Sequence, residues 1–443
     1  MKKIIIHLLC VIAFGNSIAI HAQQSQSDTI ILMNYNVGNY GFPATSNCPL
    51  LNTSIKHGYL RTVLNYVHPD IIGLMKMNAY QSFCNDSVIH FVMDSVCNGC
   101  YGHGVFTNVS GYSKENMIYY NTNKIGFIST TTIYGGDPNI SDINLHKLFY
   151  KSPALSITHD TIFLNIILVH DKSGSGNASQ RATEIAGAMS WLNSHVTTPG
   201  NYVFMGDFNT QSSNEACFQD MVNASNINIR FIDPVNQPGD WGNNPTAFAN
   251  YLTQSTRTTD PGDCNSTGGM DNRFDMILCT QPIMDGTDSV KYIPDTCNVL
   301  GQDGNHTNLA IIDAPTNTSV PANVLNALYY MSEHLPVVMD LQVNYSIPLG
   351  IKDAPKPTIT FDFNNIITEN LSIKTMVNES FQNDKTISVL IYDTKGRLLF
   401  QDSINSKETK IISMSNFASG IYFLTFMQGN VPLSHGKLVK ISE

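Results

Sequence analysis

Up to about residue 345, short apolar runs alternate with amphipathic stretches, and this pattern predicts a mixed α/β fold. Segments 53–67 and 181–196 carry apolar residues at helical spacing, which predicts two amphipathic helices. Further apolar runs predict buried strands at residues 29–34, 70–74, 117–120, 161–169, 202–205, 274–279 and 337–343. The predicted fold class is α/β: a four-layer α/β sandwich of two packed β-sheets flanked by helices.

The pattern changes after residue 345. Segments 347–350 and 354–357 contain Pro and Gly and are typical of a linker. Beyond them only short β-like runs occur, and runs 388–392 and 398–401 flank a glycine-containing turn. About seven strands are expected, which predicts a small C-terminal β-sandwich. The predicted domains are residues 28–345, a linker at 346–360 and the β-sandwich at 361–443.

The beginning of the chain predicts export. Lys2 and Lys3 precede an apolar stretch over residues 4–14, and small residues lead to an expected cut after Ala22. The apolar core is too short to span a bilayer. Residues 1–22 are therefore predicted to be a signal peptide, and we expect no transmembrane segment in the mature chain.

Eight cysteines follow the expected cut, and an even number in an exported chain favours disulfides. Cys97 and Cys100 have the spacing of a redox or zinc motif. Because no second pair with zinc spacing exists, a loop disulfide between them is the favoured interpretation. The remaining connectivity stays open.

Composition narrows the classes of partner. Hydrophobic residues make up 42% of the chain and charged residues 14%, which is typical of a folded protein. The net charge of −10 argues against a tight, sequence-independent binder of nucleic acid, because the phosphates would be repelled. It does not exclude an enzyme that acts on phosphate esters.

The most informative segment is Gly206–Asn209, which directly follows the apolar run 202–205. A carboxylate at 207 and an amide at 209 are aimed at one point, where they can hold a hard cation or orient a water beside a phosphate. Alone, the segment is equally typical of an Asp/Asn-rich turn. Polar residues at the ends of other apolar runs favour a shared cleft instead: Asn34–Val37, Pro69–Lys76, Val169–His170 and Ser332–Val337.

Over roughly residues 28–343 the chain resembles the endonuclease/exonuclease/phosphatase superfamily. The resemblance lies in an ordered set of motifs: Tyr35–Val37, Pro69–Leu74, Gly206–Asn209, Arg273–Asp275 and Ser332–Val337. The set is specific, although no single member is. It implies a secreted phosphoesterase that hydrolyses phosphodiester bonds in a nuclease-like manner.

The resemblance also implies roles for individual residues. His334 would activate the attacking water or stabilise the phosphorane, as a general base poised near neutral pH, and Asp275 would orient it. Asp207 and Asn209 would position the water and the phosphate. Asn36 would contact the metal or the phosphate.

A second histidine has a complementary implied role. His170 would protonate the leaving oxygen, with Glu115 as its orienting carboxylate. Three alternatives remain open: His170 as a structural strand-end histidine, Glu115 as a solvated loop carboxylate, and Asp275 as a structural partner of Arg273.

The chain departs from the family at Lys76, where a magnesium-binding Glu is expected. An ammonium cannot bind a cation. Lys76 could replace the metal and neutralise phosphate charge directly, or Mg or another divalent cation could bind elsewhere, through Asp207, Asn209 and Glu333. In the third alternative the site is non-catalytic. A milder departure is Glu333, where the family has Asp.

The tail resembles the type A C-terminal sorting domain of the type IX secretion system. The matching residues are Ile391–Leu398, Ser419–Phe423, Gly429 and Lys437–Lys440. The resemblance implies the type IX secretion machinery as a partner and a secreted or cell-surface location. An ordinary β-sandwich that binds carbohydrate or protein is the alternative.

The expected function is therefore phosphoester hydrolysis by a secreted, monomeric enzyme. Extracellular nucleic acid or a phospholipid head group are the candidate substrates, and segments 236–272 and 281–331 are expected to form loops over the cleft. A non-catalytic secreted binding protein on the same scaffold is one alternative. A surface-layer or adhesive role is another.

Overall fold

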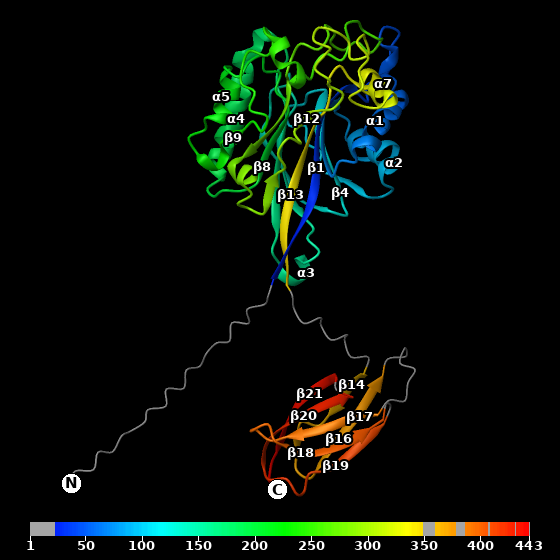
Figure 1. Cartoon of the computed structure of the whole chain (residues 1–443), viewed down its shortest axis with the longest axis vertical. Coiled ribbons are helices and arrows are strands. Elements are labelled where there is room, and N and C mark those ends of the chain that lie inside the picture. Colours follow the sequence, from blue (N-terminus) through cyan, green and yellow to red (C-terminus); the bar gives the residue numbers. More distant parts are fainter. Residues whose placement is uncertain (1–22, 349–358, 378–385, 406–407, 430, 443) are drawn as a thin grey trace, which may run out of the picture. The chain divides into compact units, whose positions relative to one another are not determined.

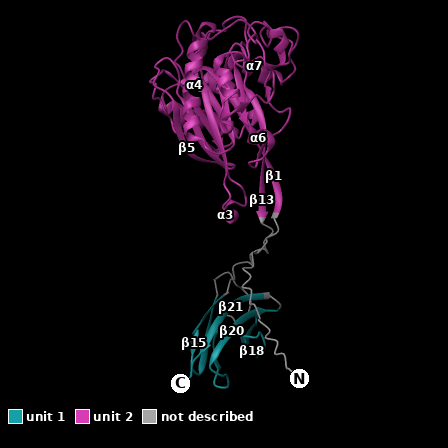
Figure 2. Cartoon of the chain, turned by 90° about the vertical axis from the view of Figure 1, so that its left-hand side faces the viewer, with its two compact units in different colours: residues 1–22, 349–443 teal, residues 23–348 magenta. Residues whose placement is uncertain are grey.

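The computed structural model describes residues 23–348, 359–377, 386–405, 408–429 and 431–442. The predicted signal peptide, residues 1–22, and residues 349–358 of the predicted linker lie outside this part of the chain. Two compact units are present, one formed by Gln23–Pro348 and one by described residues beyond 358 (Figure 2). No helix within the described ranges is long and apolar enough to cross a membrane.

The larger unit contains two β-sheets. The first has the order β11-β13-β1-β2-β4-β3, with β12 also pairing with β13, and the second has the order β5-β6-β7-β8-β10-β9. The strands of the first sheet are β1 (Gln23–Tyr40), β2 (Ile71–Asn78), β3 (Tyr101–His103), β4 (Lys114–Asn121), β11 (Val290–Tyr292), β12 (Asn298–Val299) and β13 (Val337–Pro348). The strands of the second sheet are β5 (Ile125–Tyr134), β6 (Ile143–Tyr150), β7 (Ile162–His170), β8 (Tyr202–Asp207), β9 (Phe231–Ile232) and β10 (Asp275–Thr280).

The two sheets pack face to face, and helices cover their outer faces (Figure 1). The helices α1 (Thr53–Val67) and α7 (Ala322–Met331) pack together on one side, and α4 (Ala178–His195) and α5 (Ala216–Val222) on the other. Shorter helices are α2 (Asp94–Val96), α3 (Leu155–Thr158) and α6 (Gln281–Asp285). This arrangement confirms the predicted four-layer α/β sandwich.

A buried asparagine joins the two sheets close to their common edge. Asn34 of β1 is fully buried, and its Nδ2 donates to the carbonyl of Gly206 at 3.0 Å and to that of Met276 at 3.3 Å. These carbonyls belong to β8 and β10 of the opposite sheet. The two hydrogen bonds of this buried Nδ2 resist sliding of one sheet over the other, because a displacement breaks hydrogen bonds that water cannot replace.

Gly206 is required by the packing of β7 on β8. Its φ is +153°, and a Cβ at this position would lie 2.0 Å from the carbonyl oxygen of Val169. The glycine therefore allows the parallel pair β7–β8 to remain close up to its last residues, His170 and Asp207, which lie in register.

One segment differs from its prediction. Residues 281–331 were expected to form loops over the cleft, but they contain α6, β11, β12 and α7. The reason is that α7 presents an apolar stripe to α1, and Lys56 of α1 donates to the carbonyls of Tyr330 and Met331 at its end.

Two disulfides are formed within the described residues. Cys97 pairs with Cys100, as predicted, and Cys48 pairs with Cys264. The second bridge spans 216 residues and ties the segment before α1 to the loop that follows η6 (Pro245–Tyr251). The other cysteines of the described chain, at 84, 217, 279 and 297, are free and buried.

The smaller unit is a β-sandwich of a three-stranded and a five-stranded sheet, against about seven strands predicted. Its core is apolar, and the rings of Phe361 and Phe426 stack with centroids 3.8 Å apart. The strands are β14 (Ile359–Phe363), β15 (Ile366–Ile367), β16 (Asn370–Val377), β17 (Ile387–Tyr392), β18 (Leu398–Ile404), β19 (Thr409–Ser413), β20 (Gly420–Gln428) and β21 (Val431–Lys440). The structure thus contains the predicted C-terminal β-sandwich.

We predict that Asn34→Ala lowers the free energy of unfolding of the full chain by about 2–3 kcal/mol, because two buried carbonyls lose their donor. Urea denaturation followed by intrinsic fluorescence measures the change. The matched control is Asn193→Ala on the exposed face of α4, for which a change within about 0.5 kcal/mol is expected. Equal stability of the two variants would contradict a structural role for Asn34.

Candidate active site

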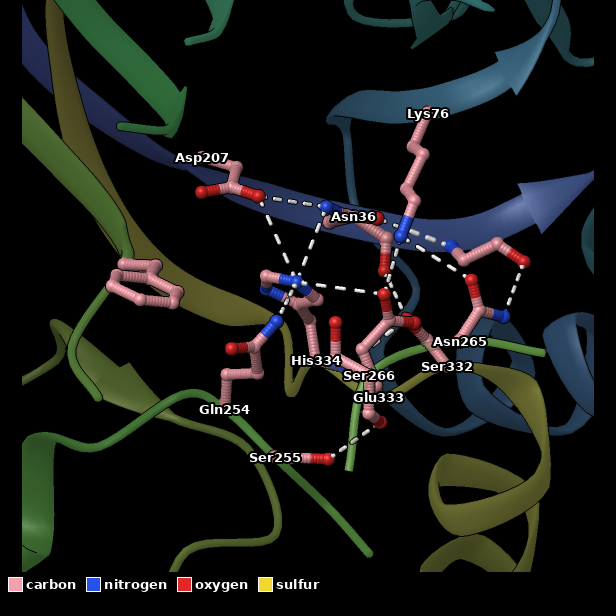
Figure 3. Close-up of polar contacts among 12 residues, drawn as sticks. Asn36, Lys76, Asp207, Gln254, Ser255, Asn265, Ser266, Ser332, Glu333 and His334 are labelled. Atoms are coloured by element: carbon pink, nitrogen blue, oxygen red, sulfur yellow. Dashed lines mark hydrogen bonds and ion pairs between the residues drawn. The ribbon is translucent and has the colours of Figure 1, made fainter. Parts of the chain in front are cut away.

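His334 is held by carboxylates on both sides of its ring. It lies immediately before β13 and is 2% exposed. Its Nδ1 is 2.7 Å from Oδ2 of Asp275, the first residue of β10. On the other side, Nε2 lies 3.7 Å from Oδ2 of Asp207 and 3.9 Å from Oε1 of Glu333 (Figure 3). The predicted contact between Asp275 and His334 is therefore present, and Arg273 pairs with Asp233 instead of Asp275.

Asp207 and Asn36 meet between the sheets. Asn36 is fully buried at the bend of β1, and its Nδ2 donates to Oδ2 of Asp207 at 2.8 Å and lies 3.3 Å from Nε2 of His334. The other carboxylate oxygen of Asp207 accepts from the backbone N–H of Asn209 at 3.0 Å. The Asn209 side chain donates to the carbonyl of Asp171. Four of the predicted site residues are thus in mutual contact.

His170 lies in the same cluster, but Glu115, its predicted partner, does not. Its Nε2 lies 3.6 Å from Oδ2 of Asp207, whereas its Nδ1 has no hydrogen-bond partner among the residues that the structure describes. Glu115 is a fully buried residue of β4 rather than a solvated loop carboxylate, and its Oε1 accepts from the backbone of Asn116. Strand alternation puts Glu115 on the face of Tyr119, whose hydroxyl bonds the carbonyl of Cys84. No hydrogen bond joins Glu115 to His170 within the described chain, so this predicted pairing is wrong.

Lys76 extends into the site and forms an ion pair. It occupies a bulge of β2 with φ at +62°, and its side chain is 14% exposed. Its ammonium donates to Oε1 of Glu333, which is fully buried, and to Oδ1 of Asn265 at 3.2 Å (Figure 3). The same Asn265 oxygen accepts from Asn39 at 2.6 Å.

The loop between η6 and β10 supplies residues that sequence analysis missed. Gln254 places its Nε2 2.8 Å from Nε2 of His334, and Asn265 contacts Lys76. Thr256 fixes the loop by donating its hydroxyl to the carbonyl of Ser332 at 2.7 Å. No local signal marks Gln254 or Asn265, because neither follows an apolar run and both act through tertiary contacts.

These residues line a cleft of about 360 Å³. Its walls come from strand ends of both sheets and from the 254–267 part of the loop, which agrees with the expectation for segment 236–272. No residue of segment 281–331 lines it within the described chain. The lining residues are Asn36, Lys76, Tyr112, Lys114, Asn139, Ile140, His170, Asp171, Lys172, Ser173, Gly174, Asp207, Asn209, Gln211, Gln254, Ser266, Thr267, Phe274 and His334.

The two histidines are in opposite protonation states. Burial lowers the pKa of His334, but Asp275, Asp207 and Glu333 outweigh burial and raise it to about 9. For His170, burial and then Lys76, Lys114 and His334 hold the pKa well below its ordinary value. At neutral pH His334 is therefore an imidazolium and His170 is neutral. The expectation that His334 is a base poised near neutral pH is wrong for this arrangement, because three carboxylates surround its ring.

The acids of the site differ just as strongly. Burial raises the pKa of Asp207 to about 6, against the opposing effect of His334 and of the hydrogen bonds from Asn36 and Asn209. Burial would also raise the pKa of Glu333, but Lys76, followed by His334 and Arg257, holds it well below its ordinary value. An imidazolium at 334 donates at both nitrogens, so it would need the Gln254 amide oxygen in the place where the structure has the amide Nε2, which a flip of this amide provides.

A divalent cation does not fit the predicted ligand set of Asp207, Asn209 and Glu333. Glu333 already accepts from Lys76 at Oε1 and from Ser332 at Oε2, the latter at 3.3 Å. The ligand atoms that do lie within 4.8 Å of one another belong to Asp207, Asp275 and His334. An ion there would have to displace the proton that His334 holds against Asp275.

Comparison with protein families identifies the tail. Residues 367–440 match the family described as the secretion system C-terminal sorting domain. The chain therefore carries a sorting domain of this class, which confirms the predicted type IX sorting tail and the predicted location at the cell surface or outside the cell. None of the curated proteins matches the chain.

Solved structures with similar folds have low identity. The human Nocturnin catalytic domain with bound sulfate is 11% identical, with a TM-score of 0.41, over 72% of this chain and 97% of that chain. An endonuclease/exonuclease/phosphatase from Beutenbergia cavernae is 12% identical, with a TM-score of 0.41, over 93% and 99%. Truncated TDP2 of Caenorhabditis elegans is 13% identical, with a TM-score of 0.41, over 71% and 97%. Values this low establish neither an activity nor a substrate.

We predict that Asp275→Asn lowers the pKa of His334 by about one unit or more, because it removes the nearest carboxylate. An NMR titration of the His334 ring in the full chain measures the change, with the exposed Asp160→Asn as the control. The raised pKa implies that ionised His334 stabilises the fold fully below pH about 6.5 and that this contribution is lost as the pH rises through about 9. In Asp275→Asn the loss should move to lower pH, and an unchanged titration would contradict the assignment.

Proposed function

We propose that the larger unit is a secreted phosphoester hydrolase that acts on phosphodiester bonds. The observation that supports the proposal is the contact of His334, Asp207, Asn36 and His170, which come from strand ends of both sheets, beside the Lys76 ammonium in one cleft. Histidines in two protonation states flanking a cation are the groups that water attack on a phosphate diester requires.

In the proposed reaction the two histidines exchange the roles implied by the family resemblance. Neutral His170 removes a proton from a water molecule at Nε2 as the water oxygen forms its bond to phosphorus. The bond from phosphorus to the leaving oxygen breaks, and the His334 imidazolium gives that oxygen its proton. Asp207 and Asn36 would orient the water and the phosphate, with Asn209 holding Asp207 in place. Both rings return to their resting states by proton exchange with solvent.

We further propose that Lys76 takes the position of a divalent cation. Its charge is fixed by Glu333 and Asn265 and faces the cleft. A catalytic metal stabilises a transition state by several kcal/mol, and a single ammonium should supply only part of that. The enzyme is therefore expected to be slower than an efficient metal-dependent nuclease.

A non-catalytic binding protein is the second candidate. The observation that favours it is the same Lys76–Glu333 pair, because it places an ammonium, which cannot bind a metal ion, at the edge of the cleft and engages the buried Glu333 carboxylate. This candidate predicts that the full chain has no turnover on any phosphoester and that Asp207→Ala and His334→Ala leave its function unchanged.

We predict that the full chain hydrolyses bis-p-nitrophenyl phosphate and that His334→Ala or Asp207→Ala lowers kcat by roughly 100-fold or more. Release of p-nitrophenol measures the rate, and plasmid DNA and RNA are tested in parallel. His195→Ala, an exposed histidine of α4, is the matched control and should keep full activity. Turnover that survives both site substitutions would refute this site as the catalytic centre.

We also predict that the activity survives a chelator, because the cation of the site is Lys76. Titration calorimetry with Mg²⁺ or Mn²⁺ should detect no binding to the native chain. Lys76→Met should lower kcat by roughly tenfold or more, since phosphate charge is no longer neutralised. Lys76→Glu should abolish chelator-resistant turnover and create a metal site beside Glu333. Activity that needs a metal in the native chain would exclude the ammonium as its substitute.

A further inference from the structure

Two more lysines line the cleft, and neither takes part in the proposed reaction. Lys114 is the first residue of β4, and Lys172 lies in the loop after β7, two residues beyond His170. Both are half-buried. Lys114 lines the same cleft as His170, and after burial and Lys76 its charge is the next cause that lowers the pKa of His170.

Neither lysine has a carboxylate partner within the described chain. Ion pairs of lysine there belong to Lys56, Lys76, Lys124 and Lys410. The charge of Lys172 acts on the carboxylates of Asp137 and Glu184, and Glu333 acts on Lys114, but only at a distance. Two half-buried ammonium groups without an ion pair, beside the ammonium of Lys76, are an unfavourable arrangement. Their repulsion is visible in Lys114, whose pKa falls to about 8 through burial, Lys76 and Lys172, despite the opposing charge of Glu333.

The backbone that carries each lysine is fixed. Arg181 of α4 is fully buried, pairs with Glu215, and donates from Nη1 to the carbonyls of Lys172 and Gly174 at 3.1 and 2.8 Å. Ser141 donates to the carbonyl of Lys114 at 3.0 Å. Anchored backbone removes one part of the ordering cost of binding an anion, although the lysine side chains must still be ordered.

We propose that Lys114 and Lys172 bind a second phosphate of the substrate, while its scissile phosphate lies at Lys76 and His334. The inference rests on the proposed function, which it extends from phosphodiesters in general to small phosphoesters that carry a further phosphate group. An anion between the lysines removes their repulsion and makes charge-assisted hydrogen bonds. Tyr112 and Phe274, which line the same cleft, offer aromatic surface to the organic part of such a substrate.

The cleft volume agrees with a substrate of this size. About 360 Å³ is enough for a nucleotide or a phosphorylated sugar. The second phosphate could thus come from a nucleotide or from a sugar bisphosphate, and the shared chemistry is two phosphates on one small molecule.

The test compares two chromogenic substrates that differ only in one phosphate: thymidine 5′-(4-nitrophenyl phosphate) and its 3′-phosphorylated form. The full chain should hydrolyse the 3′-phosphorylated form with a kcat/KM at least about tenfold higher at low salt. Lys114→Gln and Lys172→Gln should each reduce this ratio severalfold, and the double variant should bring it close to one. Lys291→Gln removes the same charge from an exposed site on β11 and should leave the ratio unchanged.

Inhibition of the chromogenic assay by small bisphosphates shows whether the second phosphate comes from a nucleotide or from a sugar. Thymidine 3′,5′-bisphosphate and fructose 1,6-bisphosphate are each compared with the corresponding monophosphate. A gain for both compounds supports recognition of the phosphate pair alone, and a gain for the nucleotide only supports additional contact with the base. No gain for either overturns the proposal.

A binding measurement separates this inference from the proposed function. Titration calorimetry with methylenediphosphonate, which cannot be hydrolysed at its P–C–P bridge, should show at least about tenfold tighter binding than inorganic phosphate, and the double lysine variant should lose the difference. If no ester is hydrolysed while this difference is found, the proposed function fails and the subsite stands. If esters are hydrolysed but the ratio of the two thymidine substrates is one, the subsite is overturned and the hydrolase stands.

Discussion

The hydrogen bonds of Asn34 are the constraint on which the site depends. They connect β1 of one sheet to β8 and β10 of the other, directly beneath the residues that meet in the cleft. Asn36 lies two residues beyond Asn34 on β1. Asp207 directly follows Gly206, and Asp275 directly precedes Met276, the two residues whose carbonyls accept from Asn34. Side chains from different sheets keep their contacts only when the sheets are held in a fixed position relative to each other. The directional hydrogen bonds of Asn34 fix this position more strictly than apolar packing alone does.

Within that frame, electrostatics decide what the site can do. The Lys76 ammonium and the His334 ring lie among three carboxylates in a buried cluster, so most of the charge is balanced by close partners rather than by water. Lys76 neutralises Glu333, and Asp275 with Asp207 keeps His334 protonated. His170, whose pKa is held well below its ordinary value by burial and by the neighbouring cations, is the neutral member of the pair.

Helices and strands with a strong local pattern could be predicted from the sequence, whereas elements and contacts that depend on tertiary packing could not. The helix at 53–67 has the bounds that its periodicity predicts. The seven strands predicted in the larger unit are present, and five of them are longer than predicted: β2, for example, continues through Lys76 because its pairing with β4 resumes after a bulge. The strands β3, β5, β6, β9, β11 and β12 were not predicted. Segment 281–331 was wrongly predicted to be loops. Helix α7 has a short apolar stripe, and a helix of this length is stabilised mainly by its packing against α1, which the sequence does not show.

The sequence alone determined the helix at 53–67, seven strands of the larger unit, the sorting tail and the site residues Asn36, His170, Asp207, Asp275 and His334, since these signals are short and local. Tertiary structure decided which of those residues meet, excluded Glu115 from the cluster and brought in Gln254, Asn265, Lys114 and Lys172. It also decided that Lys76 pairs with Glu333, 257 residues away. Charge pairing and pKa depend on separations of a few ångströms between distant parts of the chain, and no local pattern of residues encodes such distances.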